Sequence, residues 1–177
     1  FTCMTAVTAN QVLLQAKDIK ILVIGDIMVD RFVNGSVSRV SPEAPVSVLN
    51  LENEMVSLGG AGNVVANLSG LGVIAYMIAV IGKDEASQIV TEKLAAQKIC
   101  GEKMVFDASR PTTTKTRYMA GQHHLLRVDS EITGRFSPEV EEQIIDNTKE
   151  LIPQMGAVIL SDYGKGVLSA DVLAKVI

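Results

Sequence analysis

Three short runs of apolar residues constrain the fold of this chain more than any other feature. They lie at residues 19–26, 73–81 and 157–161. Continuous apolar runs of this length are typical of strands buried on both faces, in a sheet covered by helices. Amphipathic patterns typical of helices lie between and after them, at residues 62–71, 84–98 and 137–152. This alternation of strands and helices predicts an α/β core.

Two further regions, 31–58 and 112–129, have a different pattern, in which apolar and polar side chains alternate. Alternation is typical of strands in a sheet with one buried and one solvent-facing side. A break at Ala120-Gly121 divides the second region into a hairpin-like pair of strands. We therefore expect a small sheet that projects from the core. A one-faced sheet of this kind needs a covering partner, either a ligand or a second copy of the chain.

Composition excludes several classes of function. The 177 residues suit one domain with a sizeable core and are short for two. The net charge of −4 leaves no broad basic surface, so we expect no nucleic-acid partner. The longest apolar run is about half as long as a membrane span requires. The first 18 residues lack the pattern of a signal peptide. A cytoplasmic location without a membrane partner is the expectation.

The two ends of the chain give weaker signals. Residues 10–18 are expected to form a short helix with Asn10 as its cap. Cys3 and Cys100 lie far apart in sequence, which favours two inert thiols in a reducing compartment. Residues 169–177 begin a helix that follows only three core strands. This pattern predicts the N-terminal part of a larger domain, and the alternative is a small complete domain.

Residues 57–72 contain five glycines in sixteen positions. A dinucleotide-binding loop needs Gly or Ala at the last position of G-x-G-x-x-G/A, where this chain has Val65. A phosphate-binding loop ending in Gly-Lys-Ser/Thr does not occur in the sequence. His123 and His124 are adjacent, so on a strand they point to opposite faces. No His, Cys and Asp residues have metal-ligand spacing. Taken alone, a glycine-rich turn before a helix is more often a packing device than a binding site.

The order of several motifs favours a binding site over a packing device. The segments are "GDIMVDRFVNG", "SRVSPEAPV", "GGAGNV" and "LSDYGKGVL". In this order they resemble the ribokinase-like (PfkB) carbohydrate kinases, and within that family they are similar to the D-glycero-D-manno-heptose 7-phosphate kinases. The resemblance covers residues 20–170. It implies a ribokinase-like α/β fold with a parallel-rich central sheet, flanking helices and a small β-sheet lid. The expected core is about 19–30, 59–106 and 132–177, and the expected lid is about 31–58 and 107–131.

The resemblance also implies which residues bind a sugar. Gly59 and Gly60 lie under the sugar, where the absence of a side chain lets the backbone approach. Asn63, at the start of the following helix, hydrogen-bonds a sugar hydroxyl. Asp30 matches the carboxylate that accepts hydrogen bonds from two neighbouring hydroxyls. Asp26, closer to the end of its strand, is expected to be structural and to accept hydrogen bonds from nearby backbone.

A sugar that already carries a phosphate needs fixed cations. Lys115 and Arg117 are two residues apart and therefore share one face of a strand. The other candidates for the phosphate end are Arg127, Lys165 and Arg39. The alternative for each of these cations is that it is only a hydrated side chain on the solvent-facing side of the small sheet. Asp162 occupies a position where the family often has a polar sugar-site residue, and its alternative is to brace the loop.

The activity implied by the resemblance is transfer of the ATP γ-phosphoryl group to the anomeric hydroxyl of a heptose 7-phosphate, with Mg²⁺. The catalytic base of the family belongs to a "GAGD" motif, which does not occur in these residues. The resemblance therefore implies that this base lies beyond Ile177. We expect this segment alone to be inactive, to contain no catalytic residue and to bind no cofactor.

A homodimer through the lid sheet is also expected. Two alternatives to the heptose 7-phosphate kinase stay open. One is a kinase of the same family for another sugar or nucleoside, and the other is a non-catalytic module that binds a sugar phosphate.

Overall fold

The core is a parallel sheet, as the apolar runs predicted. The computed structural model describes residues 16–177. In it, β1 (Lys20–Gly25) lies between β4 (Ile74–Ile78) and β9 (Ala157–Ser161), and both pairings are parallel. The predicted N-terminal helix and its cap Asn10 lie outside the described residues, except for its last three positions, and so does Cys3.

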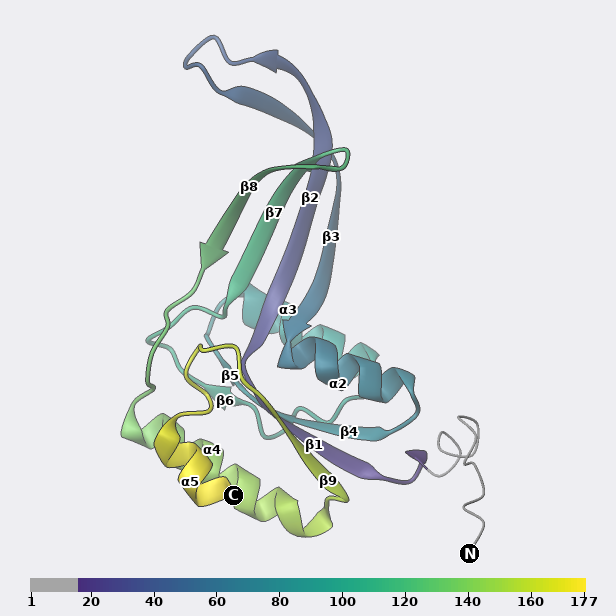
Figure 1. Ribbon diagram of the computed structural model, residues 1–177, viewed down its shortest axis with the longest axis vertical. Helices are drawn as coiled ribbons and strands as arrows, with labels where there is room; N and C mark the ends of the chain where they lie inside the picture. The colour runs from purple at the N-terminus through teal and green to yellow at the C-terminus, as the bar shows by residue number, and fades with distance from the viewer. Residues whose placement is uncertain (1–15) are drawn as a thin grey trace, which may run out of the picture.

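Helices cover both faces of this sheet (Figure 1). One face packs against α2 (Ala61–Gly70) and α3 (Glu85–Ala96), and the other against α4 (Pro138–Leu151) and α5 (Ala170–Val176). Alternate residues of β1 divide between the two faces, because successive strand side chains point in opposite directions. Val23 packs with α2 and α3, whereas Leu22 and Ile24 pack with α4 and α5. The 3₁₀ helix Ile152–Gln154 follows α4 directly.

The apolar run 73–81 was expected to be one strand, and the structure corrects this expectation. The run is split into β4 and a two-residue strand β5 (Val80–Ile81), which pairs with β6 (Val105–Phe106) in a separate small sheet. Between the two strands, the carbonyl of Ala79 accepts a hydrogen bond from the N–H of Val105 at 2.9 Å. The chain therefore leaves the central sheet at Ala79 to pair with a later segment.

The alternating regions form a second, four-stranded sheet, which we call the lid sheet. Its order is β3 (Ser47–Gly60), β2 (Ile27–Val40), β7 (Thr114–Ala120) and β8 (His123–Ser130). Figure 1 shows it rising from the core, with the tip of the β2–β3 hairpin bent over. The base of β2 belongs to both parts, because Ile27 and Val29 are buried in the core cluster. The expected boundary near residue 30 therefore falls inside a strand.

Two aspartates fix the loops around the junction of core and lid sheet. The carboxylate of Asp26, which is 1% exposed, accepts hydrogen bonds from the backbone N–H groups of Tyr163, Lys165 and Val167. This confirms the structural role predicted for Asp26, and it holds the glycine-rich loop after β9. Asp84 caps α3 and also accepts hydrogen bonds from the N–H and hydroxyl groups of Thr112, just before β7. Among the helices of residues 16–177, none is both long and apolar enough to cross a membrane.

Candidate functional site

A cavity of about 480 Å³ lies at the base of the lid sheet, above the first turn of α2. Strands β2, β3, β7 and β8 contribute to its lining, together with α2 and the loop after β9. Distant parts of the chain therefore meet in one place. Most of the site residues predicted from the sequence line this cavity: Asp30, Gly59, Gly60, Asn63, Lys115, Arg117 and Arg127.

Both glycines of the pair are needed by the protein itself. A Cβ atom on Gly59 would lie 2.1 Å from Oδ2 of Asp30 and 2.8 Å from Cγ of Met28. Gly60 has a φ of +57°, and a Cβ there would lie 2.4 Å from the carbonyl oxygen of Asp26. The glycines thus leave room for the Asp30 carboxylate and let the backbone turn from β3 into α2. Close packing and the proposed sugar contact are compatible at this pair.

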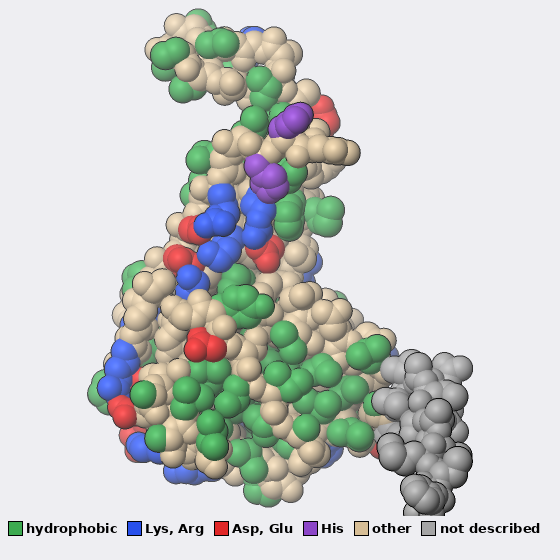
Figure 2. All heavy atoms as spheres, in the orientation of Figure 1, with side chains coloured by type: hydrophobic (Ala, Val, Ile, Leu, Met, Phe, Trp, Pro, Cys, Tyr) green, Lys and Arg blue, Asp and Glu red, His purple; other side chains and the backbone are tan. Residues whose placement is uncertain are grey.

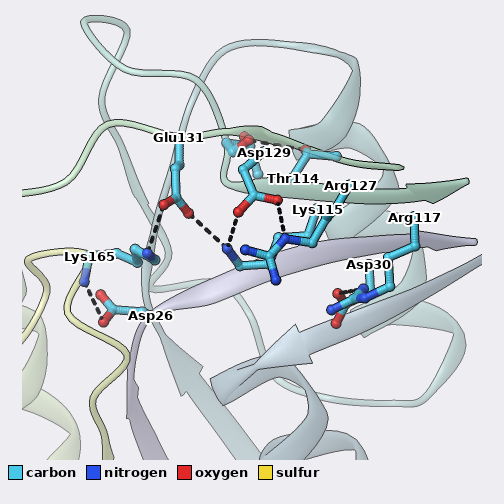
Figure 3. Close-up of polar contacts among 10 residues, drawn as sticks. Asp26, Asp30, Thr114, Lys115, Arg117, Arg127, Asp129, Glu131 and Lys165 are labelled. Carbon is cyan, nitrogen blue, oxygen red and sulfur yellow. Dashed lines mark hydrogen bonds and ion pairs between the residues drawn. The ribbon is translucent and has the colours of Figure 1, made fainter. Parts of the chain in front are cut away.

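Asp30 and Arg117 form the first polar group of the cavity (Figure 3). Nη1 of Arg117 donates a hydrogen bond to Oδ1 of Asp30 at 2.5 Å, and the guanidinium lies 5.0 Å from the centre of the Phe32 ring. Oδ2 of Asp30 is the oxygen that faces Gly59. The guanidinium therefore holds one carboxylate oxygen in place, and the other oxygen lies beside the glycine backbone.

Five further side chains form an alternating series of charges, which we call the ion-pair chain. Arg127 Nε contacts Asp129 Oδ1 at 3.0 Å, and Asp129 Oδ2 accepts from Lys115 Nζ at 3.1 Å. Lys115 Nζ also donates to Glu131 Oε2 at 3.1 Å, and Glu131 Oε1 accepts from Lys165 Nζ at 2.9 Å. Figure 3 shows the series running from β8 across β7 to the loop that carries Lys165. Each carboxylate in it is shared by two cations.

The pKa values agree with these contacts. The hydrogen bond from Lys165 lowers the pKa of Glu131, with a smaller opposing effect of burial and further lowering by Lys115. The hydrogen bond from Lys115 lowers the pKa of Asp129. Burial acts to lower the pKa of Lys115, but its hydrogen bonds to Asp129 and Glu131 outweigh burial, and the pKa is raised. All three groups are therefore charged at neutral pH.

Three predicted residues do not line the cavity. Lys165 lines a separate, smaller cavity beside Asp26 and Ile132, and it reaches the ion-pair chain through Glu131. Asp162 is exposed and accepts a hydrogen bond from the N–H of Gly164, so it braces the loop. Arg39 lies nine residues beyond Asp30 on β2. At about 3.3 Å per residue this separates their backbones by about 30 Å, and the structure does not bring Arg39 to the cavity.

Ile177 does not line the cavity either. The catalytic base that the family resemblance implies is expected beyond this residue. Ile177 caps the C-terminal end of α5, where its N–H donates a hydrogen bond to the carbonyl of Leu173 at 3.0 Å. Its side chain is 91% exposed and apolar, so it offers no group for proton transfer or for binding a sugar. Ile177 is therefore not a site residue, and the base beyond it stays a prediction.

The sequence interpretation missed several residues of this site: Phe32, Asp129, Glu131 and Tyr163. A signal for three of them was present. Arg127, Asp129 and Glu131 are spaced by two residues, which places them on one side of an extended segment. Phe32 likewise has the same parity as Asp30 on β2. Tyr163 has no such signal, because the turn after β9 sets its position.

The arrangement suits a ligand with many hydroxyl groups and one anionic group. A carboxylate oxygen and the side chain of Asn63 can bond hydroxyls, and cations at the other end can bond an anion. Figure 2 shows the lysine and arginine side chains gathered on this side of the lid sheet. Within residues 16–177, no three His, Cys, Asp or Glu side chains come together as a metal site.

Comparison with known proteins identifies what this chain resembles. The family model described as "pfkB family carbohydrate kinase" matches residues 18–175. A curated relative, "Bifunctional protein HldE" of Azorhizobium caulinodans, is 46% identical over 155 residues, which cover 87% of this chain and 32% of the relative. A protein of the same name from Helicobacter hepaticus is 40% identical over 164 residues, covering 93% and 34%. The chain thus spans about a third of these relatives' length.

Solved structures show the same fold at low sequence identity. A putative phosphofructokinase from Staphylococcus aureus has a TM-score of 0.67 and 14% identity, with 89% of this chain and 48% of that chain covered. Phosphofructokinase-2 from Escherichia coli, in complex with substrates and products, has a TM-score of 0.65 and 15% identity, with 89% and 49% covered. These matches confirm the ribokinase-like α/β fold predicted from the sequence.

Proposed function

Because this chain belongs to the pfkB family of carbohydrate kinases, we propose that the full-length protein phosphorylates a heptose 7-phosphate at its anomeric hydroxyl. The observation that carries the proposal is the composition of the cavity. A carboxylate with one oxygen beside the glycine pair stands on the β2–β3 side, and the ion-pair chain, of whose three cations Lys115 and Arg127 line the cavity, stands on the β7–β8 side. A sugar with a phosphate on its far end has the matching groups.

At the ring end, Asp30 and Asn63 bind hydroxyls. Oδ1 of Asp30 is held by Arg117, so Oδ2 accepts the hydrogen bond from the sugar beside Gly59. Asn63 is exposed in the first turn of α2 and lines the same cavity. Fixed groups of this kind orient the ring without rearrangement, which is how positioning contributes to rate.

At the phosphate end, Lys115, Arg127 and Lys165 bind the anion. Ammonium and guanidinium groups make charge-assisted hydrogen bonds to phosphate oxygens, and these are stronger than bonds between neutral groups. Arg127 is the most exposed of the three, with 59% of its side chain accessible, against 15% for Lys115 and 17% for Lys165. The two lysines are therefore the fixed part of the phosphate site.

The phosphoryl donor is ATP with Mg²⁺, as the family resemblance implies. The metal would neutralise charge on the transferring phosphoryl group. The metal-ligating side chains of the described residues form no group that fits Mg²⁺, so we assign it no ligand here. The "GAGD" motif with the family's base is absent from this sequence, and we assign no base either. The residues described here bind and orient the acceptor sugar.

The proposal extends to the setting of the protein. A kinase that uses ATP and a soluble sugar phosphate works in the cytoplasm. Its product is a heptose bisphosphate, which would supply the activated heptose used in the synthesis of lipopolysaccharide core. We also propose a homodimer through the lid sheet, with no nucleic-acid or membrane partner. The relatives named HldE and the family match support the sugar kinase part of this proposal.

The test compares two acceptors in the full-length protein: heptose 7-phosphate and the same heptose without phosphate. Lys165→Ala should weaken the binding of heptose 7-phosphate on the order of ten- to a hundredfold, because a charge-assisted bond is worth roughly 1.5–3 kcal/mol. It should leave the affinity for the heptose without phosphate unchanged. Asp30→Asn should weaken the binding of both sugars. Lys103→Ala, which removes a lysine paired with Glu150 outside the cavity, is the matched control.

Arg117→Ala is a poor probe of the phosphate alone, because it also releases Asp30. We expect it to weaken both sugars. Equal loss of both sugars in Lys165→Ala would contradict the phosphate site. ATP turnover with another sugar or a nucleoside, but not with heptose 7-phosphate, would favour a different kinase of the family. Sugar-phosphate binding without any turnover would favour a binding module.

A further inference from the structure

Among the described residues, Glu131 is the carboxylate that contacts both Lys115 and Lys165. It lies one residue after β8 ends, where the chain returns from the lid sheet to the core. Its two oxygens contact two lysines from different parts of the fold. Lys115 belongs to β7 of the lid sheet, and Lys165 belongs to the loop after β9. A single carboxylate therefore lies between the two fixed cations of the proposed phosphate site.

The charges at this point are already balanced by the protein. Glu131 is ionised, since Lys165 and Lys115 lower its pKa. Lys115 donates to both Asp129 and Glu131, which occupies two of the three donors of its ammonium group. An incoming anion must therefore share these lysines with Glu131 or displace it. Charges a few ångströms apart near a protein surface interact strongly enough to decide such a competition.

We propose that Glu131 competes with the ligand's phosphate for Lys115 and Lys165 and thereby lowers the affinity of this site for phosphate groups. This inference rests on the proposed function, because it concerns the same phosphate site. A free inorganic phosphate has only the cations of the ion-pair chain to bind, and the Glu131 carboxylate competes with it for two of them. A phosphorylated sugar meets the same competition, and its additional bond to Asp30 at the ring end raises its affinity above that of inorganic phosphate. Because Glu131 lowers both affinities, a ligand needs the phosphate and the ring contact together to bind tightly.

The test measures the binding of inorganic phosphate to the full-length protein by titration calorimetry. Glu131→Gln keeps the size and one acceptor of the side chain but removes its charge. We expect inorganic phosphate to bind this variant on the order of tenfold more tightly than the wild type. The affinity for heptose 7-phosphate should rise by a similar factor, whereas the same heptose without phosphate should bind as it does to the wild type. Glu131→Asp, which keeps the charge, should keep the wild-type affinities.

The matched control is Glu150→Gln, which removes another lysine–glutamate pair, Lys103 Nζ to Glu150 Oε2 at 2.6 Å, outside the cavity. It should not change phosphate affinity. A gain of affinity cannot arise from partial unfolding, so the expected result separates competition by Glu131 from a structural role. Phosphate binding by Glu131→Gln that is unchanged, weaker or undetectable overturns the inference. The titration measures binding and requires no turnover. A failure of the proposed reaction would therefore not change its outcome.

Discussion

Gly59 and Asp30 share one small space, so a side chain at position 59 would disturb the Asp30 carboxylate directly. We predict that Gly59→Ala displaces the Asp30 carboxylate, because the new Cβ would lie 2.1 Å from Oδ2. The free energy of unfolding should fall by about 1–3 kcal/mol, as is typical of overpacking. Sugar binding should fall further than stability, since the displaced atom is the proposed hydroxyl acceptor. Denaturant unfolding and ligand titration measure the two effects.

Gly70→Ala is the control for this substitution. Gly70 ends α2, and a Cβ there has no atom within 4 Å. Alanine should therefore be neutral or stabilise by a few tenths of a kcal/mol through its helix propensity. If Gly59→Ala behaved like Gly70→Ala, the Asp30 carboxylate would be free to move, and its position beside the glycines would not matter.

The alternation of side chains along a strand was enough to place Lys115 and Arg117 on one face, but it did not show how their charges are balanced. In the structure Arg117 lies directly opposite Arg127 on β8. Like charges in this relation destabilise a sheet. Asp30 and Asp129 compensate for them, and Asp30 is 87 residues away from Arg117 in the chain. Such a contact depends on the parallel pairing of β2 with β7, which single-sequence patterns do not contain.

At the scale of elements, Asp84 joins helix α3 to the start of β7, and this link should depend on pH. Burial acts to raise the pKa of Asp84, but its hydrogen bonds with Thr112 and Ser87 outweigh burial, and the pKa is lowered from 3.8. A lowered pKa means that the ionised form stabilises the fold. This stabilisation is complete above pH 3.8 and is lost as the pH falls through the lowered value.

We predict that Asp84→Asn reduces the free energy of unfolding at pH 7 by about 1–3 kcal/mol, because the amide NH₂ cannot accept the hydrogen bond that Oδ2 of Asp84 accepts from the N–H of Thr112. The difference from the wild type should shrink as the pH falls below 3.8, because the wild-type carboxyl becomes protonated. Urea unfolding at pH 7 and near pH 3 measures this. A difference that stays constant over that range would show that the charge of Asp84 contributes nothing.

Strand β1 was predictable because burial on both faces leaves only apolar residues. The apolar run 157–161 also predicted a strand correctly, but the first two residues of β9 are exposed, so the expected burial on both faces was wrong there. The start of α4 was predictable as well, since Ser137 caps it and Pro138 is its first residue. The break at Ala79 was not, because it depends on pairing with Val105, 26 residues later. Local patterns thus identified which segments are strands, whereas their partners are set by contacts between distant segments.

On the scale of the whole molecule, the two faces of the lid sheet differ sharply. The face with Asp30 and Lys115 is charged and lines the cavity. The opposite face carries the ion pair of Arg31 and Glu54 on β2 and β3, and an apolar group formed by Val33, Tyr118, Leu126 and Val128. Leu126 is 58% exposed and Val128 is 46% exposed. Apolar surface of this kind on a projecting sheet is where the proposed homodimer would form its interface.

The proposed homodimer would bury this apolar face, and Leu126→Glu should therefore weaken it. A two-fold interface contains each residue twice, and burial of one leucine contributes roughly 1.5–3 kcal/mol. The dimer dissociation constant should consequently rise by at least about a hundredfold. Light scattering of the full-length protein at micromolar concentration measures the change. Phe106→Glu, at a position on β6 that is 52% exposed, is the control and should leave the dimer intact. A wild-type protein that is monomeric at this concentration, or a dimer that tolerates Leu126→Glu, would show that the apolar face of the lid sheet has another role.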